Sequence, residues 1–127
     1  MLLNMIGMRL VNIEHGRIVL ADKYNHNHTV TFNCYFDSWE IAEVEATLIT
    51  DDVNALPVIT SIETRSKINN RDEDDSTGME TVITLFGMSK PLAEINAYAG
   101  SDSGYKYGAT VAITCESLSV DEDIAAW

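Results

Sequence analysis

The stretch Thr81-Val82-Ile83-Thr84-Leu85-Phe86-Gly87, followed by Pro91-Leu92-Ala93-Glu94-Ile95, is the part of the chain that decides the expected fold. β-Branched and aromatic residues fill its first half, which is typical of a strand ended by a glycine. Ser89 and Pro91 then suit the start of a helix, and apolar residues recur at helical spacing as far as Gly100. The stretch therefore predicts a strand followed by one helix over residues 91–99.

Outside this stretch, the pattern favours strands throughout. Alternating or short apolar runs bounded by turn residues predict strands; they occupy residues 9–21 (as a hairpin), 29–36, 41–50, 58–65 and 109–118. The segment from Lys67 to Gly78 has one apolar residue, Ile68, and is expected to be a mobile polar loop. From residue 41 the predicted order is strand, turn, strand, long loop, strand, helix, strand and tail.

Composition fits one compact domain. The chain has 127 residues, 46% of them hydrophobic, and a formal net charge of −12, of which residues 41–127 carry −11. Charge this negative argues against a protein that coats duplex nucleic acid, and it suits a protein that binds basic partners. No apolar run approaches the ~20 residues of a membrane span, and no signal peptide is recognisable. We expect no membrane association and a cytoplasmic location, in the host cell if the protein is viral.

The last residues form an acidic segment that ends in an aromatic side chain. Asp121, Glu122 and Asp123 precede Ile124, and Trp127 closes the sequence. A stretch this acidic is expected to stay solvated and mobile, so the chain divides into a β-rich domain over 1–118 and a tail over 119–127. These five residues would bind a partner protein whose apolar pocket takes Trp127 and whose basic residues bind the carboxylates. The alternative is a frayed end whose Trp127 folds back on the domain.

The order of elements from residue 41 resembles the five-stranded OB barrel with its single helix. The strand 81–87 and the Leu-Ala-Glu helix after it resemble the third strand and helix of single-stranded DNA-binding proteins of the bacterial and phage type. The acids, Asp-Ile pair and terminal aromatic of 121–127 are similar to that family's tail tip. The resemblance implies a mostly β, OB-fold-like barrel with one α-helix, extra N-terminal strands, single-stranded DNA as ligand, and a tip that recruits a replication or repair protein with a basic pocket.

Several features depart from that family. About 40 residues precede the first matching strand, a fifth barrel strand is absent after Leu118, and the usual linker before the tip is nearly missing. Glu43 and Glu45 lie on the polar face of the first strand, where a DNA-binding surface calls for Lys or Arg.

Single-strand binding needs cations along a groove and aromatic faces for the bases. The candidate cations are Arg65, Lys67, Arg71 and Lys106, and the candidate stacking residues are Tyr105, Tyr107 and Trp39. The alternatives are a solvated mixed-charge loop for the cations, because four acids follow Arg71, and ordinary packing for the aromatics.

Chemistry beyond binding is not indicated. His26 and His28 have the spacing of a metal-binding pair, but no third ligand is visible in the sequence, so a polar turn is the favoured interpretation and we expect no metal or cofactor. No nucleophile motif or phosphate loop is present, so we expect no enzyme. The leading interpretation is a single-stranded DNA-binding protein of replication or recombination with a partner-recruiting tip. The alternatives are an acidic inhibitor that mimics DNA toward a nucleic-acid-binding enzyme, and a β-rich virion or assembly protein; self-association stays open.

Overall fold

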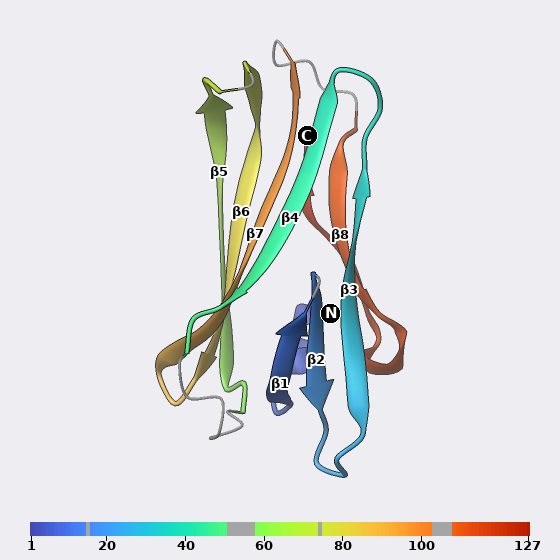
Figure 1. Ribbon diagram of the computed structural model, residues 1–127, viewed down its shortest axis with the longest axis vertical. Helices are drawn as coiled ribbons and strands as arrows, with labels where there is room; N and C mark the ends of the chain where they lie inside the picture. The colour runs from blue at the N-terminus through green and yellow to red at the C-terminus, as the bar shows by residue number, and fades with distance from the viewer. Residues whose placement is uncertain (15, 51–57, 74, 103–107) are drawn as a thin grey trace.

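The computed structural model describes residues 1–14, 16–50, 58–73, 75–102 and 108–127. Its described strands form two antiparallel sheets that pack face to face (Figure 1). The five-stranded sheet has the order β1-β2-β3-β8-β9 and comprises Arg9–Glu14, Arg17–Ala21, Asn27–Tyr35, Thr110–Cys115 and Val120–Ala126. The four-stranded sheet has the order β4-β7-β6-β5 and comprises Glu40–Leu48, Lys90–Asp102, Ser76–Gly87 and Ser61–Arg71. The expectation of a mostly β protein is confirmed.

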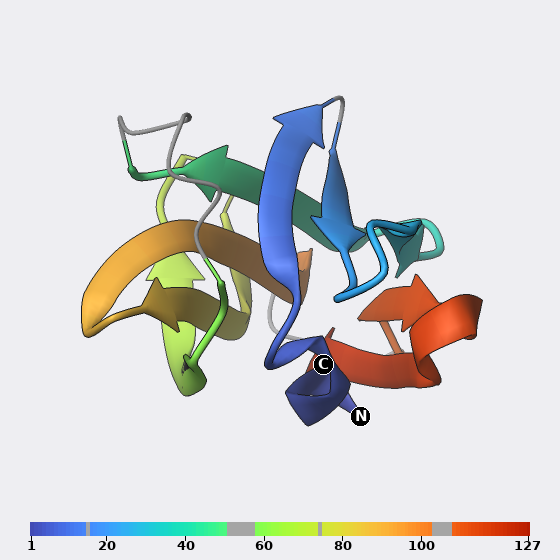
Figure 2. The same cartoon turned by 90° about the horizontal axis from the view of Figure 1, so that it is seen from below.

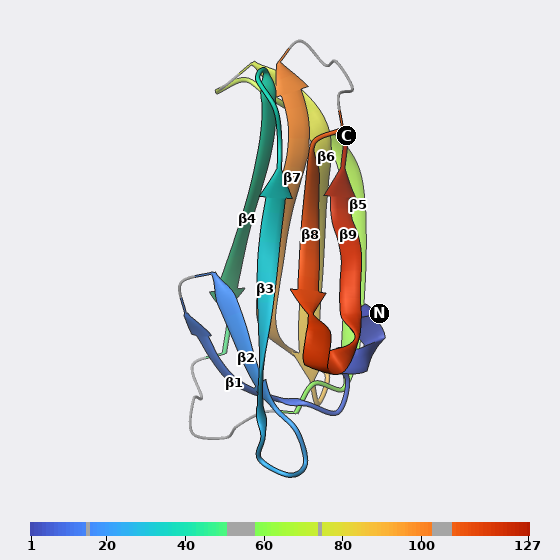
Figure 3. The ribbon, with the colours of Figure 1, turned by 90° about the vertical axis from the view of Figure 1, so that its right-hand side faces the viewer.

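The chain changes sheets twice, from β3 to β4 and from β7 to β8. Three hairpin-connected strands, β5 to β7, lie beside β4, which reaches β5 through the long connection 49–60. This is a Greek key. Figure 3 looks onto the five-stranded sheet, where β8 lies between β3 and β9 although it comes much later in the chain than β3.

The core lies between the sheets and is built by alternate residues of each strand. Fully buried side chains come from both layers: Ile18, Leu20, Val30, Val111 and Ile113 from one, and Ile83, Leu85, Ile95, Ala97 and Ala99 from the other. Two short 3-10 helices, η1 (Leu2–Met5) and η2 (Glu116–Leu118), lie at one end. Figure 2 shows η1 beside the corner between η2 and β9, where the amino group of Met1 donates to the Ser119 carbonyl at 2.8 Å.

The helix expected over 91–99 is wrong, because these residues belong to strand β7, and no α-helix occurs among the described residues. The strand pairs with β4 on one side and β6 on the other. Ala93, Ile95, Ala97 and Ala99 all face the core, at the period of two that a strand requires. The same segment also has apolar residues at helical spacing, namely Leu92, Ile95 and Ala99. It is a strand and not a helix because it pairs with a neighbouring strand along both of its edges.

The loop expected from Lys67 to Gly78 is also wrong, since both of its arms are strands. Ser61–Arg71 pairs with Ser76–Gly87 in one unbroken antiparallel register from Ser61↔Phe86 to Arg71↔Ser76. The segment is polar because β5 is an edge strand and most of its residues are exposed, so few of them need to be apolar.

The solvated tail expected over 119–127 is wrong as well. Residues Val120–Ala126 form β9, which pairs with β8, and Ile124 is only 9% exposed. The OB barrel is not formed either. The described strands build two open sheets, each with its own edge strands, rather than one sheet closed on itself. None of the described helices is both long and apolar enough to span a membrane.

Candidate functional site

The outward face of the four-stranded sheet concentrates charge. Glutamates project from all four strands in register: Glu43 and Glu45 from β4, Glu63 from β5, Glu80 from β6 and Glu94 from β7. We call these five residues and their surroundings the glutamate face. Because residues of like parity share a face of a strand, Arg65, Lys67 and Arg71 of β5 lie on it too.

The structure therefore places the three predicted cations on one surface, but not as free cations. The side chain of Arg65 lies 3.7 Å from Glu63, that of Lys67 lies 3.9 Å from Glu80, and that of Arg71 lies 2.8 Å from Glu43. In each pair the glutamate neutralises the positive charge that would otherwise attract a phosphate. The side chains of Arg65 and Lys67 remain 72% exposed, so these two ion pairs are surface pairs of low energy.

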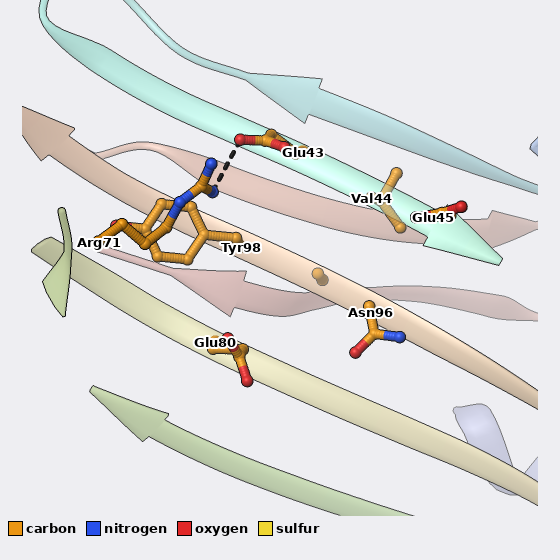
Figure 4. A pocket seen from close by; sticks show the side chains of 8 residues that line it. Glu43, Val44, Glu45, Arg71, Glu80, Asn96 and Tyr98 are labelled. Atoms are coloured by element: carbon orange, nitrogen blue, oxygen red, sulfur yellow. Dashed lines mark hydrogen bonds and ion pairs between the residues drawn. The ribbon is translucent and has the colours of Figure 1, made fainter. Parts of the chain in front are cut away.

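Arg71 is held more firmly than the other two cations. Its guanidinium lies over the ring of Tyr98, 4.4 Å from the centroid, while its Nη1 donates to Oε1 of Glu43 (Figure 4). The Tyr98 hydroxyl shares a 2.8 Å hydrogen bond with Ser76. Behind the ring lies Gly100, where an added Cβ would come within 2.7 Å of the Tyr98 hydroxyl oxygen. The missing side chain lets the ring lie against the sheet, and Arg71 covers the ring.

A hollow of about 420 Å³ opens beside this stack. Its charged lining is Glu43, Glu45 and Glu80 against Arg71 alone, with Asn96 between them (Figure 4). Even with Arg71 paired to Glu43 and Lys67 lying 3.9 Å from Glu80, three carboxylates against two cations leave the hollow negative, which favours a cation as occupant. A basic side chain fits this electrostatic setting better than a phosphate does.

An exposed aromatic turn adjoins the Glu43 end of the face. Tyr35, the last residue of β3, is 58% exposed, and Phe36 and Trp39, in the turn from β3 to β4, are 61% and 72% exposed. We call these three residues the aromatic turn. Three large apolar side chains exposed within five residues are more than scattered surface apolars account for.

Hydrogen bonds hold the aromatic turn in one conformation. Asp37 N donates to Glu40 Oε1 at 2.6 Å, and Asp102 N donates to the Trp39 carbonyl at 2.7 Å. Trp39 itself has φ +70°, a left-handed conformation that bulky residues rarely adopt. A strained, exposed Trp is a feature typical of binding sites. The predicted residues Tyr105, Lys106 and Tyr107 lie outside the described residues.

The predicted partner-binding residues do not form one exposed set. Asp121 and Asp123 are exposed on β9, whereas Glu122 accepts a hydrogen bond from Leu2 N and Ile124 is buried. Trp127 is half-buried against the core, with its backbone N donating to Ala109 O at 2.9 Å. The alternative in which Trp127 folds back on the domain is the arrangement observed.

A hydrogen-bonded chain links Asp22, His28 and Ser117. His28 Nε2 lies 2.8 Å from Asp22 Oδ2, and its Nδ1 lies 2.7 Å from Ser117 Oγ. The hydrogen bond from His28 and the backbone N–H groups of His26 and Tyr24 lower the pKa of Asp22 to about 2. No sequence pattern indicated this chain, because Ser117 is 89 residues from His28. Among the described residues no group of three potential ligands is placed to hold a metal ion.

Comparisons with known proteins add no relative to this description: no family model, no curated protein and no solved structure matches the chain.

Proposed function

We propose that this protein is a non-enzymatic binding protein that docks on a basic surface of a partner protein, through the glutamate face and the aromatic turn. The observation that carries the proposal is the acidic hollow, where Glu43, Glu45 and Glu80 surround one guanidinium that is already paired. Carboxylates arranged this way attract Lys and Arg side chains and steer their approach.

The aromatic turn supplies apolar contact area, which the charged residues of the glutamate face do not provide. Trp and Tyr provide much of the binding energy at protein interfaces, and charged residues around them act mainly on the rate of association. Trp39 and Tyr35 are already exposed and held in place, so docking orders little further chain. Basic surfaces with exposed apolar pockets include the nucleic-acid-binding sites of enzymes. Inhibition of such an enzyme by carboxylates that occupy phosphate positions is the specific form of this function that we favour.

Parallel titrations with an arginine-rich peptide and with oligothymidylate, both followed by intrinsic Trp fluorescence, test the proposal. We expect salt-sensitive binding of the peptide and none of the oligonucleotide. Trp39→Asn keeps a residue that tolerates positive φ, and it should cost about 0.5–1 kcal/mol of peptide binding through the lost cation–π contact. Because Trp39 is also the expected reporter, the variant is measured by calorimetry.

Charge variants locate the binding surface. Glu45→Gln with Glu94→Gln should weaken peptide binding, and Glu116→Gln with Asp121→Asn is the matched control, equal in charge change but in η2 and β9. Equal weakening by both pairs would show that bulk charge alone binds the peptide, and the proposed site would be wrong.

A second candidate, single-stranded DNA binding, rests on Arg65 and Lys67, whose exposed side chains are spaced for successive phosphates along β5. Replacing Arg65, Lys67 and Arg71 by Ala should then weaken oligothymidylate binding and flatten its salt dependence by up to about one unit of slope per lost contact. Recruitment of a replication or repair protein by the C-terminal residues would require β9 to leave the sheet, because Ile124 is buried there.

A further inference from the structure

The outer edge of β4 carries backbone groups that no described strand pairs with. β4 is the last strand of its sheet and pairs with β7 along one edge only. It also touches β1, β3 and β8, but these belong to the other sheet, and no backbone ladder joins them to β4 in the described chain. Figures 1 and 3 both show β1 and β2 at the opposite end of the molecule from the start of β4, so neither lies along its first half.

The register of β4 against β7 decides which of its residues face the outer edge. Asp102 N donates to the Trp39 carbonyl at 2.7 Å before the start of β4, and Ile49 N donates to the Leu92 carbonyl at 2.8 Å after its end. Residues of an antiparallel pair bond their partners alternately, so the odd-numbered residues between these two bonds direct their N–H and C=O groups toward β7. The even-numbered residues direct theirs to the outer edge, namely Ala42, Val44 and Ala46.

The side chains of these three edge residues are only partly covered. Ala42, Val44 and Ala46 face the core but are half-buried, whereas the inward residues of the neighbouring β7, such as Ile95 and Ala97, are buried. A strand added beside β4 would supply hydrogen-bond partners for the edge and apolar cover for this row. The added strand therefore needs apolar residues at every second position.

The outward side chains of β4 select the other positions of the added strand. Glu43 and Glu45 alternate with the edge residues and belong to the glutamate face. A second copy of β4, laid antiparallel about Val44, would oppose Glu43 to Glu45 twice, and an axis at residue 43 or 45 would oppose a glutamate to itself. Like charges directly across a strand pair are destabilising, and opposite charges are stabilising. The edge therefore disfavours a second copy of itself and favours a strand with Lys or Arg at these positions.

We propose that the partner docks an extended segment on this edge, as an added antiparallel strand in which Lys or Arg residues oppose Glu43 and Glu45 and apolar residues oppose the three edge residues. The inference rests on the proposed function and adds to it the conformation and sequence pattern of the partner's segment. In strand addition of this kind, main-chain hydrogen bonds provide affinity and alternate side chains provide specificity. Trp39, exposed in the aromatic turn just before β4, lies where one end of the added strand would pass.

Backbone N-methylation of a model peptide tests the strand. The peptide has Arg at alternate positions with Val between them, and calorimetry measures its dissociation constant. In the proposed register the Val N–H groups bond to β4 and the Arg N–H groups face solvent. N-methylation of the Val residues should therefore raise the dissociation constant by about tenfold or more. The matched control, N-methylation of the same number of Arg residues, makes the same chemical change on the other edge of the peptide and should leave it nearly unchanged.

Amide hydrogen exchange, followed by NMR, tests the edge on the protein itself. In the free protein the amides of Ala42, Val44 and Ala46 should exchange faster than those of Glu43 and Glu45, and the peptide should slow the exchange of the first three. Equal effects of the two N-methylated peptides, or edge amides already protected in the free protein, would overturn the added strand while leaving a charge-driven proposed function in place. Failure of every basic peptide to bind would overturn both.

Discussion

At the scale of single residues, Gly100 is packed closely against the Tyr98 ring on the glutamate face. A Cβ at residue 100 would lie 2.7 Å from the Thr77 carbonyl oxygen as well as from the Tyr98 hydroxyl. The carbonyl belongs to the neighbouring strand and cannot move away alone. We expect Gly100→Ala to lower the free energy of unfolding by about 1–3 kcal/mol, measured by urea denaturation.

Tyr98→Phe is the companion variant. It keeps the ring beneath Arg71 and removes only the hydroxyl that bonds Ser76, so it should cost about 0.5–1.5 kcal/mol. If Gly100→Ala were as stable as the wild type, the strands would have shifted to admit the methyl group, and the close packing would not be a constraint.

Asp22 predicts a stability change in acid. Its folded-state pKa, lowered to about 2 chiefly by the hydrogen bond from His28, lies below the ordinary value of 3.8. The charged form is therefore favoured by folding, and this contribution is present above pH 3.8 and is lost as pH falls toward 2. Wild-type protein should lose more unfolding free energy between about pH 4 and pH 2 than Asp22→Asn does. Parallel slopes for the two proteins in that window would contradict the prediction.

The sequence indicated part of the site at this scale. The spacing of Arg65, Lys67 and Arg71 places them on one face of any strand that contains all three, although only Arg65 was expected in one. Their partners Glu43 and Glu80 could not be found, because strand register, and not spacing, brings them within reach. Trp39 was a candidate stacking residue with ordinary packing as the alternative, and the structure shows it 72% exposed.

At the scale of elements, the strands were predictable where apolar residues alternate against a covered face. The segments expected over 29–36, 41–50 and 81–86 correspond to β3, β4 and β6. β7 was missed because alanine, a good helix former, occupies positions 93, 97 and 99, and its small size suits both a helix face and a closely packed strand. β5 was missed beyond Arg65 because an edge strand needs no apolar face.

Because β9 is part of the sheet, its deletion is expected to destabilise the fold, whereas deletion of a free tail would leave the fold intact. Its pairing with β8 buries Val120, Ile124 and Ala125, and burial of one Val or Ile side chain contributes about 1.5–3 kcal/mol. Deletion of residues 120–127 should therefore lower the thermal midpoint sharply or prevent folding, as read by circular dichroism.

The control for that deletion is Asp121→Asn with Asp123→Asn. It removes charge from the exposed row of β9 and leaves the buried residues unchanged, so its thermal midpoint should stay close to that of the wild type. A deletion protein that melts like the wild type would show that β9 adds nothing to the sheet.

At the scale of the whole molecule, net charge opposes compactness. A chain of net charge −12 repels itself when folded, and salt screens that repulsion. We expect the thermal midpoint to rise by a few degrees between about 10 mM and 0.5 M NaCl. The doubly neutralised variant Glu45→Gln with Glu94→Gln should show a smaller rise. A midpoint that falls with salt would indicate that the ion pairs of β5 outweigh the net repulsion.

The fold class followed from the sequence, but the topology did not. Alternation predicts strands without saying which strands pair, and the expected barrel and the observed two-layer arrangement share most of their strands. The choice between them depended on two segments, β7 and β9, whose pairing comes from contacts far along the chain.

The position of β8 between β3 and β9 has a consequence for synthesis. Thr31 and Thr114, paired across β3 and β8, are 83 residues apart. On the ribosome, the meander of β1 to β3 emerges before the strand that covers its open edge is made, because β4 to β7 are synthesised between them. Until β8 emerges, the nascent chain holds an uncapped edge and the inward side chains Val30 and Phe32 without their neighbours, which leaves it open to misassociation during this interval.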